Sequence, residues 1–596
     1  MSLSPSDSLD IARLAPRLRA GELRPSQIVG GVLERIARRG DDKVWIDLLS
    51  RDELMARATE LEHRGPAGLP LYGLPFAIKD NIDLAGHATT AACREFAYTP
   101  VASAPVVQSL LDAGAIAIGK TNLDQFATGL VGTRSPYGAC ANAFDSRYIS
   151  GGSSSGSAVA VAKDLVTFSL GTDTAGSGRV PAAFNGLLGV KPTRGLLSTQ
   201  GVVPACRTLD CVSIFARTCH EAHEVWRAAR GLDPADPFSR EPRCGENAAP
   251  WQNQSFRFGV PPQQQLEFFG DQEAAELYQS AVKKLLQIGG KKIEIDFSVF
   301  RQAADLLYGG PWVAERLAAI KGFFRDHASE IEPVVREIIG GAERYTAVDA
   351  FEADYRLREL RREAEKQWAE MDVLVLPTTG TIYSHEQIAA EPVKLNTNLG
   401  YYTNFVNLMD LAAIAAPAGF RSNGLPFGIS FIAPAFSDEA LLALANRYLG
   451  TAAPPLTKPP GCVELAVVGA HLTGQPLNGQ LTERGARLEK ICRTAPNYRL
   501  FALPDSSPPK PGLIRDEQSQ GVGIEVEVWA MPEDQFGSFV AAVPPPLTIG
   551  TATLDSGESV KCFLCEPHAV SGALEITHHV GWRAYLSSSH LSSSKS

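Results

Sequence analysis

The N-terminal part of the chain has the spacing of amphipathic helices. Within residues 8–39, apolar side chains recur every three or four positions, which is the period of one helix face. Pro25 predicts a break and a new helix start. Residues 54–61 predict a further helix. This region therefore reads as scaffold.

Two short segments are too continuously apolar for surface helices. Residues 74–78 and 115–118 are apolar throughout and predict buried strands. Lys79 closes the first strand, and Asp124 with Gln125 predicts a helix start after the second. The first strand would carry its terminal lysine into the interior.

From residue 256 onward, strand and helix patterns alternate. Strand-like runs at 256–260, 291–297, 373–376 and 428–432 are accompanied by helical runs at 271–288 and 437–449. Such alternation predicts βαβ units and an α/β fold. Gly289 and Gly290 predict the end of the first of these helices.

A proline-rich segment precedes a second set of strands. Four prolines within residues 451–460 predict a stiff, extended connector. Beyond it, strand-like runs occur at 465–469 and 524–529, and residues 555–557 predict a hairpin turn. We therefore predict domains at 1–451 and 462–586, a linker at 452–461, and a disordered serine-rich tail at 587–596.

The composition narrows the possible partners. The 596 residues are 44% hydrophobic and 20% charged, as in a globular protein, with a net charge of −10 and no basic block. This argues against nucleic acid and anionic membranes as partners. Without a signal-like N-terminus or an apolar run of about 18 residues, we expect a cytoplasmic location. Of ten cysteines, Cys562 and Cys565 form the single CxxC, which predicts two buried thiols rather than a metal site.

Two glycine- and serine-rich loops are the strongest candidates for a site. Residues 151–157 and 171–178 flank an alanine- and valine-rich run that is too apolar for a linker. Loops held in this way can present hydroxyls and backbone N–H donors. If Lys79 is buried beside them, its pKa falls and it becomes a general base. Two structural turns and a snorkelling surface lysine are the alternatives.

These segments together resemble the amidase signature family. The resemblance rests on ordered blocks at residues 76–81, 119–122 (Gly-Lys-Thr-Asn), 151–154 (Gly-Gly-Ser-Ser), 171–177 (Gly-Thr-Asp-Thr-Ala-Gly-Ser), 181–183 and 189–192. It implies an α/β fold with a mixed β-sheet core covered by helices. It also implies Ser177 as nucleophile, Ser153 after a cis peptide bond as bridging serine, and Lys79 as base.

The same resemblance implies an oxyanion hole. The backbone amides of Thr174, Ala175, Gly176 and Ser177 would stabilise the charge of the tetrahedral state. Ser155 and Ala175 stand where the family more usually has glycine. Neither change adds or removes a reacting group, so we expect the chemistry to be retained.

Two other motifs occur by their letters alone. Residues 114–121 fit the phosphate-loop expression, but the residues between the glycines are apolar and predict a strand instead of a loop of exposed amides. Residues 152–156 fit the nucleophile elbow around Ser154, but no histidine and acid follow in the expected places. We reject both interpretations.

Residues 307–316 indicate a substrate class. Composition alone predicts an ordinary surface helix that starts after Pro311. The segment also resembles the allophanate hydrolases, a branch of the amidase signature family in which a tyrosine and an arginine at this spacing hold the substrate. By this resemblance Arg316 binds the substrate carboxylate through its guanidinium fork, and Tyr308 donates a hydrogen bond.

The C-terminal part resembles the small α+β domain of γ-glutamylcyclotransferase-like type found in allophanate hydrolases. Residues 467–476 would be its site loop, with His471 as the candidate functional group. The loop lacks the Tyr-Gly-Ser of cyclotransferases, which argues against that activity. A lone histidine is more often structural, and that alternative stays open.

The expected function is hydrolysis of allophanate with release of ammonia. The product, N-carboxycarbamate, would be decarboxylated with help of the C-terminal domain, giving two ammonia and two carbon dioxide in all. No metal, biotin or nucleotide is implied, and a separate urea carboxylase would supply the substrate. The resemblance implies a homodimer. The alternatives are another amidase of the family acting on a small carboxylate-bearing amide, or an amidotransferase subunit.

Overall fold

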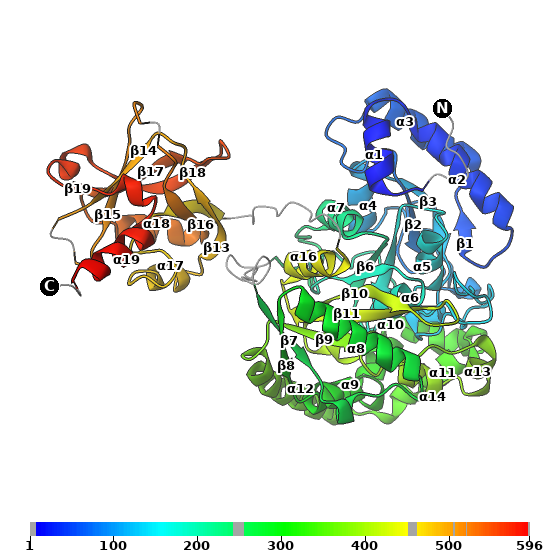
Figure 1. The fold of residues 1–596 in the computed structure, drawn as a ribbon. Coiled ribbons are helices and arrows are strands. Elements are labelled where there is room, and N and C mark those ends of the chain that lie inside the picture. The colour runs from blue at the N-terminus through cyan, green and yellow to red at the C-terminus, as the bar shows by residue number, and fades with distance from the viewer. Residues whose placement is uncertain (1–7, 242–254, 451–461, 505–506, 520, 594–596) are drawn as a thin grey trace. The chain divides into compact units, whose positions relative to one another are not determined.

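The computed structural model describes residues 8–241, 255–450, 462–504, 507–519 and 521–593 (Figure 1). These residues form two compact units, one containing the described residues up to 450 and the other those from 462 onward. The predicted linker at 452–461 lies outside the described residues. Each unit has its own core, and each is described separately.

The larger unit begins with the three predicted helices, α1 (Ile11–Arg19), α2 (Pro25–Arg39) and α3 (Arg51–Arg64). Pro25 occupies the first turn of α2, where its missing N–H costs nothing. Ser50 caps α3 in a capping box with Glu53. Apart from Arg35, the buried residues of these helices are the periodic apolar ones, so the amphipathic prediction is confirmed.

An eleven-stranded mixed sheet runs through this unit in the order β1-β3-β2-β4-β6-β5-β10-β11-β9-β7-β8. Its strands are β1 (Trp45–Leu48), β2 (Pro75–Lys79), β3 (Ile116–Thr121), β4 (Phe168–Asp173), β5 (Leu188–Lys191), β6 (Cys211–Ala216), β7 (Phe256–Val260), β8 (Gly290–Glu294), β9 (Val373–Pro377), β10 (Leu411–Phe420) and β11 (Pro426–Pro434). Pairing is parallel for β3-β2-β4 and for β9-β7-β8, and antiparallel between these two groups. The prediction of a mixed sheet covered by helices is confirmed.

Helices cover this sheet (Figure 1). They are α4 (Pro105–Asp112), α5 (Ser155–Ala162), α6 (Arg179–Phe184), α7 (Cys219–Ala229), α8 (Gln272–Gln287), α9 (Ser298–Gly309), α10 (Trp312–His327), α11 (Pro333–Gly340), α12 (Ala347–Trp368), α13 (His385–Ala390), α14 (Lys394–Leu399), α15 (Phe405–Leu408) and α16 (Asp438–Leu449). Strand β3 contains Gly119, Lys120 and Thr121, so the phosphate-loop letters lie in a buried strand, as predicted. The predicted helix start at Asp124 is only a 3-10 turn, η2 (Gln125–Ala127).

The smaller unit is an α+β fold with two sheets. One has the order β13-β16-β12-β18-β17 and the other β15-β14-β19. The strands are β12 (Cys462–Val467), β13 (Arg487–Arg493), β14 (Tyr498–Ala502), β15 (Pro511–Arg515), β16 (Glu525–Pro532), β17 (Leu547–Thr553), β18 (Ser559–Cys565) and β19 (Leu574–Glu575), and the helices are α17 (Gly479–Thr482), α18 (Glu533–Ala541) and α19 (Trp582–Ser593). The predicted turn at 555–557 joins β17 to β18. Cys562 and Cys565 are buried free thiols, as predicted.

The segment from residue 587, for which we predicted a disordered tail, is helical as far as Ser593. Helix α19 extends through this segment. Buried Trp582 anchors its first turn against the core, and the hydroxyls of Ser587 and Ser588 donate to the carbonyls of Arg583 and Tyr585 within the helix. The serine composition did not indicate this helix, in which the two hydroxyls bond to backbone carbonyls of the preceding turn.

Across the residues with described coordinates, no helix has the length and apolar character needed to cross a membrane. In the same set, no cluster of three or more histidine, cysteine, aspartate or glutamate side chains is arranged to hold a metal ion.

Candidate functional site

Lys79 lies in the interior of the larger unit, at the C-terminal end of β2. Its side chain is 0% exposed. Its ammonium nitrogen Nζ is 2.8 Å from Ser153 Oγ and 2.7 Å from Thr172 Oγ1. Burial lowers the pKa of Lys79 to about 7, although the carboxylates of Asp124 and Asp173 oppose the shift. Near neutral pH, a large fraction of this amine is therefore uncharged and able to accept a proton.

Ser153 precedes α5, within the first glycine- and serine-rich loop. The Gly152–Ser153 peptide bond is cis, and the Ser153 carbonyl accepts from the amide of Asp124 at 3.0 Å. Ser154, the centre of the rejected elbow motif, is buried and donates to the carbonyl of Thr172 at 3.1 Å. The loop therefore turns the Ser153 hydroxyl toward Lys79 and uses Ser154 to join this loop to β4.

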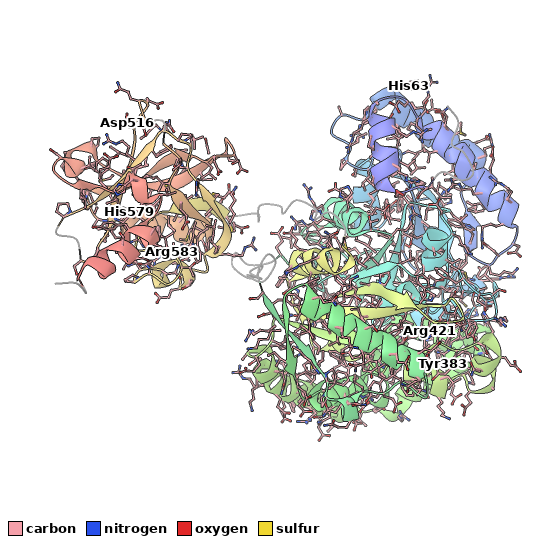
Figure 2. The ribbon with its side chains drawn as sticks, viewed as in Figure 1. His63, Tyr383, Arg421, Asp516, His579 and Arg583 are labelled. Atoms are coloured by element: carbon pink, nitrogen blue, oxygen red, sulfur yellow. The ribbon has the colours of Figure 1, made fainter. Side chains whose placement is uncertain are left out.

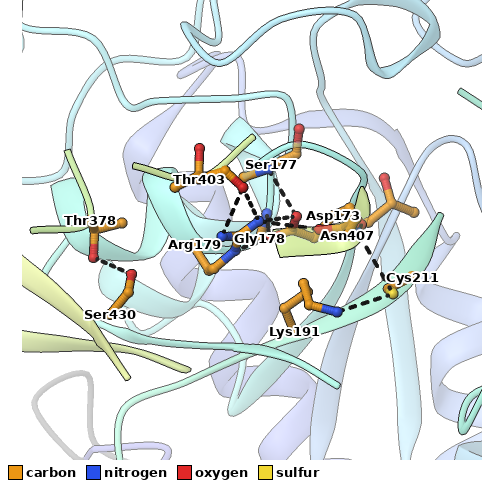
Figure 3. Close-up of polar contacts among 12 residues, drawn as sticks. Asp173, Ser177, Gly178, Arg179, Lys191, Cys211, Thr378, Thr403, Asn407 and Ser430 are labelled. Carbon is orange, nitrogen blue, oxygen red and sulfur yellow. Dashed lines mark hydrogen bonds and ion pairs between the residues drawn. The ribbon is translucent and has the colours of Figure 1, made fainter. Parts of the chain in front are cut away.

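The second loop, between β4 and α6, is held from one side by Asp173 (Figure 3). The Asp173 carboxylate accepts from the amides of Gly176 at 2.9 Å and Gly178 at 3.1 Å, and it forms a buried ion pair with Arg179 at 2.9 Å. Asn407 on α15 donates to the Asp173 carbonyl at 2.7 Å. Ser177 thus sits between two amides that are fixed on the same carboxylate.

One predicted oxyanion donor is already engaged. Because the Gly176 amide donates to Asp173, it does not point toward the site, and that part of the prediction is corrected. The amides of Thr174, Ala175 and Ser177 have no acceptor among the described residues. Three of the four predicted donors are therefore unoccupied. The Ser177 hydroxyl lies 3.5 Å from the carbonyl oxygen of Gly129.

Arg316 and Tyr308, which the resemblance to allophanate hydrolases implied as substrate-binding residues, lie in contact. Tyr308 lies on α9 and Arg316 on α10, and the tyrosine OH accepts from Arg316 Nη2 at 3.1 Å. Arg316 Nη1 donates to Thr128 Oγ1 at 3.0 Å and approaches the Ala127 carbonyl at 3.4 Å. The guanidinium is 2% exposed, and none of its contacts among the described residues is a carboxylate. A buried cation held only by neutral oxygens is suited to an anionic ligand.

The segment that faces Arg316 has an unusual backbone. Phe126 and Ala127 both have positive φ, 50° and 52°, which non-glycine residues adopt at a cost. The Asp124 carboxylate accepts from the amides of Val131, Gly132 and Arg134 and so fixes the loop that follows. Together these contacts present the Ala127 and Thr128 oxygens to Arg316.

His471 borders a cavity of about 250 Å³ in the smaller unit. Its ring stacks on Phe563 with centroids 4.9 Å apart, and Nε2 lies 3.0 Å from Gln480 Oε1. Burial lowers the pKa of His471. Gly469, Ala470 and His471 line the same cavity, and their amides donate to no acceptor in the described chain. The site thus combines a neutral imidazole with successive N–H donors, an arrangement that binds anions.

A buried carboxylate lies behind the loop that carries His471. Glu527 on β16 is 0% exposed and accepts from the amide and hydroxyl of Thr473, at 2.8 and 3.0 Å. Arg583 on α19, labelled in Figure 2, forms an ion pair with Glu527 at 2.6 Å. Glu527 thus fixes the loop that carries His471, and its ion pair with Arg583 holds α19 against β16.

Sequence reasoning missed several residues around Lys79 and Arg316. Lys79 hydrogen-bonds to Thr172, and Arg316 hydrogen-bonds to Thr128. The pKa of Lys79 is also raised by the carboxylates of Asp124 and Asp210. Thr172 lies inside the glycine-rich block, so its position already carried a signal. The others carried none, because an aspartate or threonine in a loop is ordinarily a turn residue.

Comparison with known proteins identifies the family. A family model described as Amidase matches residues 28–442. The chain belongs to the amidase family. A second model, described as Allophanate hydrolase C-terminal domain, matches residues 463–587. The amidase part thus contains every predicted catalytic and substrate-binding residue except His471.

Relatives extend over both parts of this amidase-family chain. It is 44% identical to urea amidolyase of Saccharomyces cerevisiae across 91% of its own length, but spans only 31% of that relative. It is 32% identical to a glutamyl-tRNA(Gln) amidotransferase subunit of Deinococcus deserti, over 75% of this chain and 97% of the relative. Among solved structures, Kluyveromyces lactis allophanate hydrolase superposes with a TM-score of 0.80 and 41% identity, covering 95% of this chain and 97% of that one.

Proposed function

We propose that the chain is an allophanate hydrolase, which cleaves the terminal amide of allophanate and releases ammonia. The observation that carries the proposal is a pair of buried basic side chains. One is Lys79, whose pKa of about 7 suits a base. The other is Arg316, whose hydrogen-bond acceptors in the described part of the chain are all neutral oxygens. Hydrolysis of allophanate requires a base near the serine hydroxyls and a group that binds the substrate carboxylate. The likeness to the K. lactis enzyme supports the same choice.

In the proposed mechanism, Lys79 acts through Ser153. A neutral amine has one lone pair and two N–H groups, so it can accept the Ser153 proton while it donates to Thr172. Ser153 in turn takes the proton of Ser177, whose oxygen attacks the carbonyl carbon that bears the terminal amine. The carbonyl oxygen becomes negative and accepts from the free amides of Thr174, Ala175 and Ser177.

Collapse of the tetrahedral state expels the amine, which receives the proton back from Lys79 through Ser153 and leaves as ammonia. Water then attacks the ester on Ser177 with the same base assistance and releases N-carboxycarbamate. Each missing oxyanion donor costs about 10²- to 10³-fold in kcat for comparable enzymes. The three unoccupied amides therefore account for a substantial part of the proposed rate enhancement.

Arg316 and Tyr308 would select the substrate by its carboxylate. A buried guanidinium without a carboxylate partner gains most from an anionic ligand, because little water is left to solvate it. Exchange of arginine for lysine would lose the bidentate fork. On this proposal Arg316→Ala lowers kcat/KM for allophanate far more than for the neutral propionamide.

The smaller unit would act on the product. The His471 cavity offers three free amides for a carboxylate and a wall that includes Phe539 and Phe563. A carboxylate transferred to such a surface loses solvation, which favours departure of neutral carbon dioxide. We propose that N-carboxycarbamate decarboxylates here, so that allophanate yields two ammonia and two carbon dioxide in all.

The chain spans 31% of the length of the urea amidolyase of Saccharomyces cerevisiae. We propose that a urea carboxylase supplies the allophanate. Cytoplasmic location and a homodimer stay predictions from the sequence. The second candidate function is that of an amidotransferase component. The 32% identity to the glutamyl-tRNA(Gln) amidotransferase subunit of Deinococcus deserti supports it. A component of that kind would need a partner chain for turnover.

The test is ammonia release by the purified chain alone, with allophanate, malonamate, biuret and propionamide as substrates. We expect preference for allophanate and loss of activity in Ser177→Ala. Retention of activity in that variant would contradict the assignment of the nucleophile. Turnover of propionamide as good as that of allophanate would leave the amidase chemistry and remove the substrate assignment.

A further inference from the structure

Asp210 is a buried carboxylate that the proposed mechanism does not use. It lies directly before β6, and the register of β4 with β6 pairs Asp173 with Cys211, so Asp210 comes opposite Thr174. Its side chain is 7% exposed. The Thr174 hydroxyl donates to Asp210 Oδ1 at 2.5 Å. The amides of Ala205 and Cys206 donate to the same carboxylate at 2.9 and 3.1 Å.

Two carboxylates therefore hold the loop of residues 174–178, here called the oxyanion loop, at different points. Asp173 binds the amides of Gly176 and Gly178 and is neutralised by Arg179. Asp210 holds the other end of the loop through the Thr174 side chain, and among the described residues it has no ion-pair partner. The Thr174 hydroxyl is engaged in this way, whereas the Thr174 amide has no acceptor among the described residues.

We propose that Asp210 is a positioning residue for the oxyanion hole, which fixes Thr174 so that the amides of Thr174 and Ala175 point toward the developing oxyanion. This inference rests on the proposed function of the same site. Asp210 touches no reacting atom and acts only through Thr174. A shift of about 1 Å in a catalytic group can cost roughly 10²-fold in rate, so such bracing matters most in the transition state.

The same carboxylate has a second effect that a merely structural role would not have. The charged groups that bear on the Lys79 amine are Asp124, Asp173 and Asp210, which raise its pKa, and Arg316, which lowers it. Removal of the Asp210 charge therefore lowers the pKa of Lys79 further. The basic form of the lysine then persists to lower pH. Burial raises the pKa of Asp210 itself to about 6, so it is ionised at neutral pH.

The experiment compares Asp210→Asn with wild type in the full chain, with allophanate and propionamide as substrates. We expect kcat to fall by about 10- to 100-fold on both substrates, with KM for allophanate changed by less than about threefold. The acid limb of the kcat/KM profile shifts to lower pH. A loss of Arg316 would instead be selective for allophanate, so the two roles are separable.

Asp438→Asn is the matched control. Asp438 is also buried, and it binds the amide and hydroxyl of Thr193 at 2.8 and 2.6 Å, but it does not contact the oxyanion loop. We expect its kcat to remain within about threefold of wild type. An equal loss in both variants, or a kcat for Asp210→Asn within about threefold of wild type, would overturn the proposal.

If Asp210→Asn does not fold, Thr174 decides. Thr174→Val removes the hydroxyl and keeps the amide, and Thr174→Ser keeps both. We expect Val to lower kcat as Asp210→Asn would, and Ser to retain most of it; equal activities would overturn the proposal. Where all variants fold, the double variant with Asp210→Asn should be non-additive, since both act on one hydrogen bond. Ser177→Ala tests the proposed function independently of Asp210. If this variant still released ammonia, Ser177 would not be the nucleophile and the proposed function would fail, whatever the effect of Asp210→Asn.

Discussion

Two buried lysines on neighbouring strands behave in opposite ways. Lys79 ends β2 and Lys120 lies on β3, where it pairs in register with Ile78, and both side chains are 0% exposed. Lys120 forms an ion pair with Asp80 at 3.1 Å and donates to Thr89 Oγ1 at 3.1 Å. Among the residues that the structure describes, the Lys79 amine hydrogen-bonds only to the hydroxyls of Ser153 and Thr172. Although both lysines are equally buried, Lys120 forms an ion pair, whereas Lys79 has no carboxylate partner within hydrogen-bond distance among the described residues and loses its proton more easily.

The largest expected effect is on activity at the unpaired lysine. Lys79→Met keeps the volume and the apolar stem but removes the base, so we expect kcat to fall by about 10⁴-fold or more. Ammonia release with allophanate measures this directly. The matched variant Lys120→Met should retain most of the kcat per folded molecule. Similar losses in the two variants would contradict the separation of roles.

The next effect is on stability as a function of pH. The folded pKa of Lys79 is about 7 against an ordinary value of 10.5, so between these values the unfolded chain binds the extra proton. Stability therefore rises with pH across this window, by at most about 5 kcal/mol from this group. Urea unfolding of wild type and Lys79→Met between pH 7 and 10 measures it.

Relative to wild type, the free energy of unfolding of Lys79→Met should be highest near pH 7. As the pH rises, the free energy of unfolding of the wild type should increase relative to that of the variant. A difference in the free energy of unfolding that stays constant with pH would show that Lys79 is charged when folded.

The paired lysine should dominate stability near neutral pH instead. Lys120→Met leaves the Asp80 carboxylate buried without its cation, which costs about 3 to 5 kcal/mol in comparable sites. Urea unfolding at pH 7 checks this. The double variant Lys120→Met with Asp80→Asn should recover part of the loss, because no uncompensated charge remains. No recovery would mean that packing around Lys120, rather than charge, is responsible.

The contrast also explains what the sequence could and could not predict. Helices such as α2 and the buried strand β2 follow from local periodicity and were predicted. The order of eleven strands depends on pairing between distant segments, which no local pattern contains. Lys79, Ser153 and Ser177 lie in recognisable blocks. Asp210 and Thr174 are 36 residues apart and meet only through the β4–β6 register.

Local pattern failed in a different way at Gly176. The loop sequence identifies which amides are available, but not which of them the Asp173 carboxylate captures. The direction of an amide depends on backbone angles that the surrounding core decides. The sequence therefore named four amides, and the structure engages one of them, that of Gly176, with Asp173.

The smallest expected effect tests whether hydroxyls alone hold Lys79. Thr172→Val removes one of its two contacts, the one at 2.7 Å, and leaves Ser153 in place. A single hydrogen bond of this kind contributes about 0.5 to 1.5 kcal/mol, so we expect kcat to fall by up to about tenfold. Thr172→Ser restores the hydroxyl and should restore activity. If serine were no better than valine, the methyl group of Thr172 and not its hydroxyl would matter, and Ser153 would be the sole polar partner that the reaction requires of Lys79.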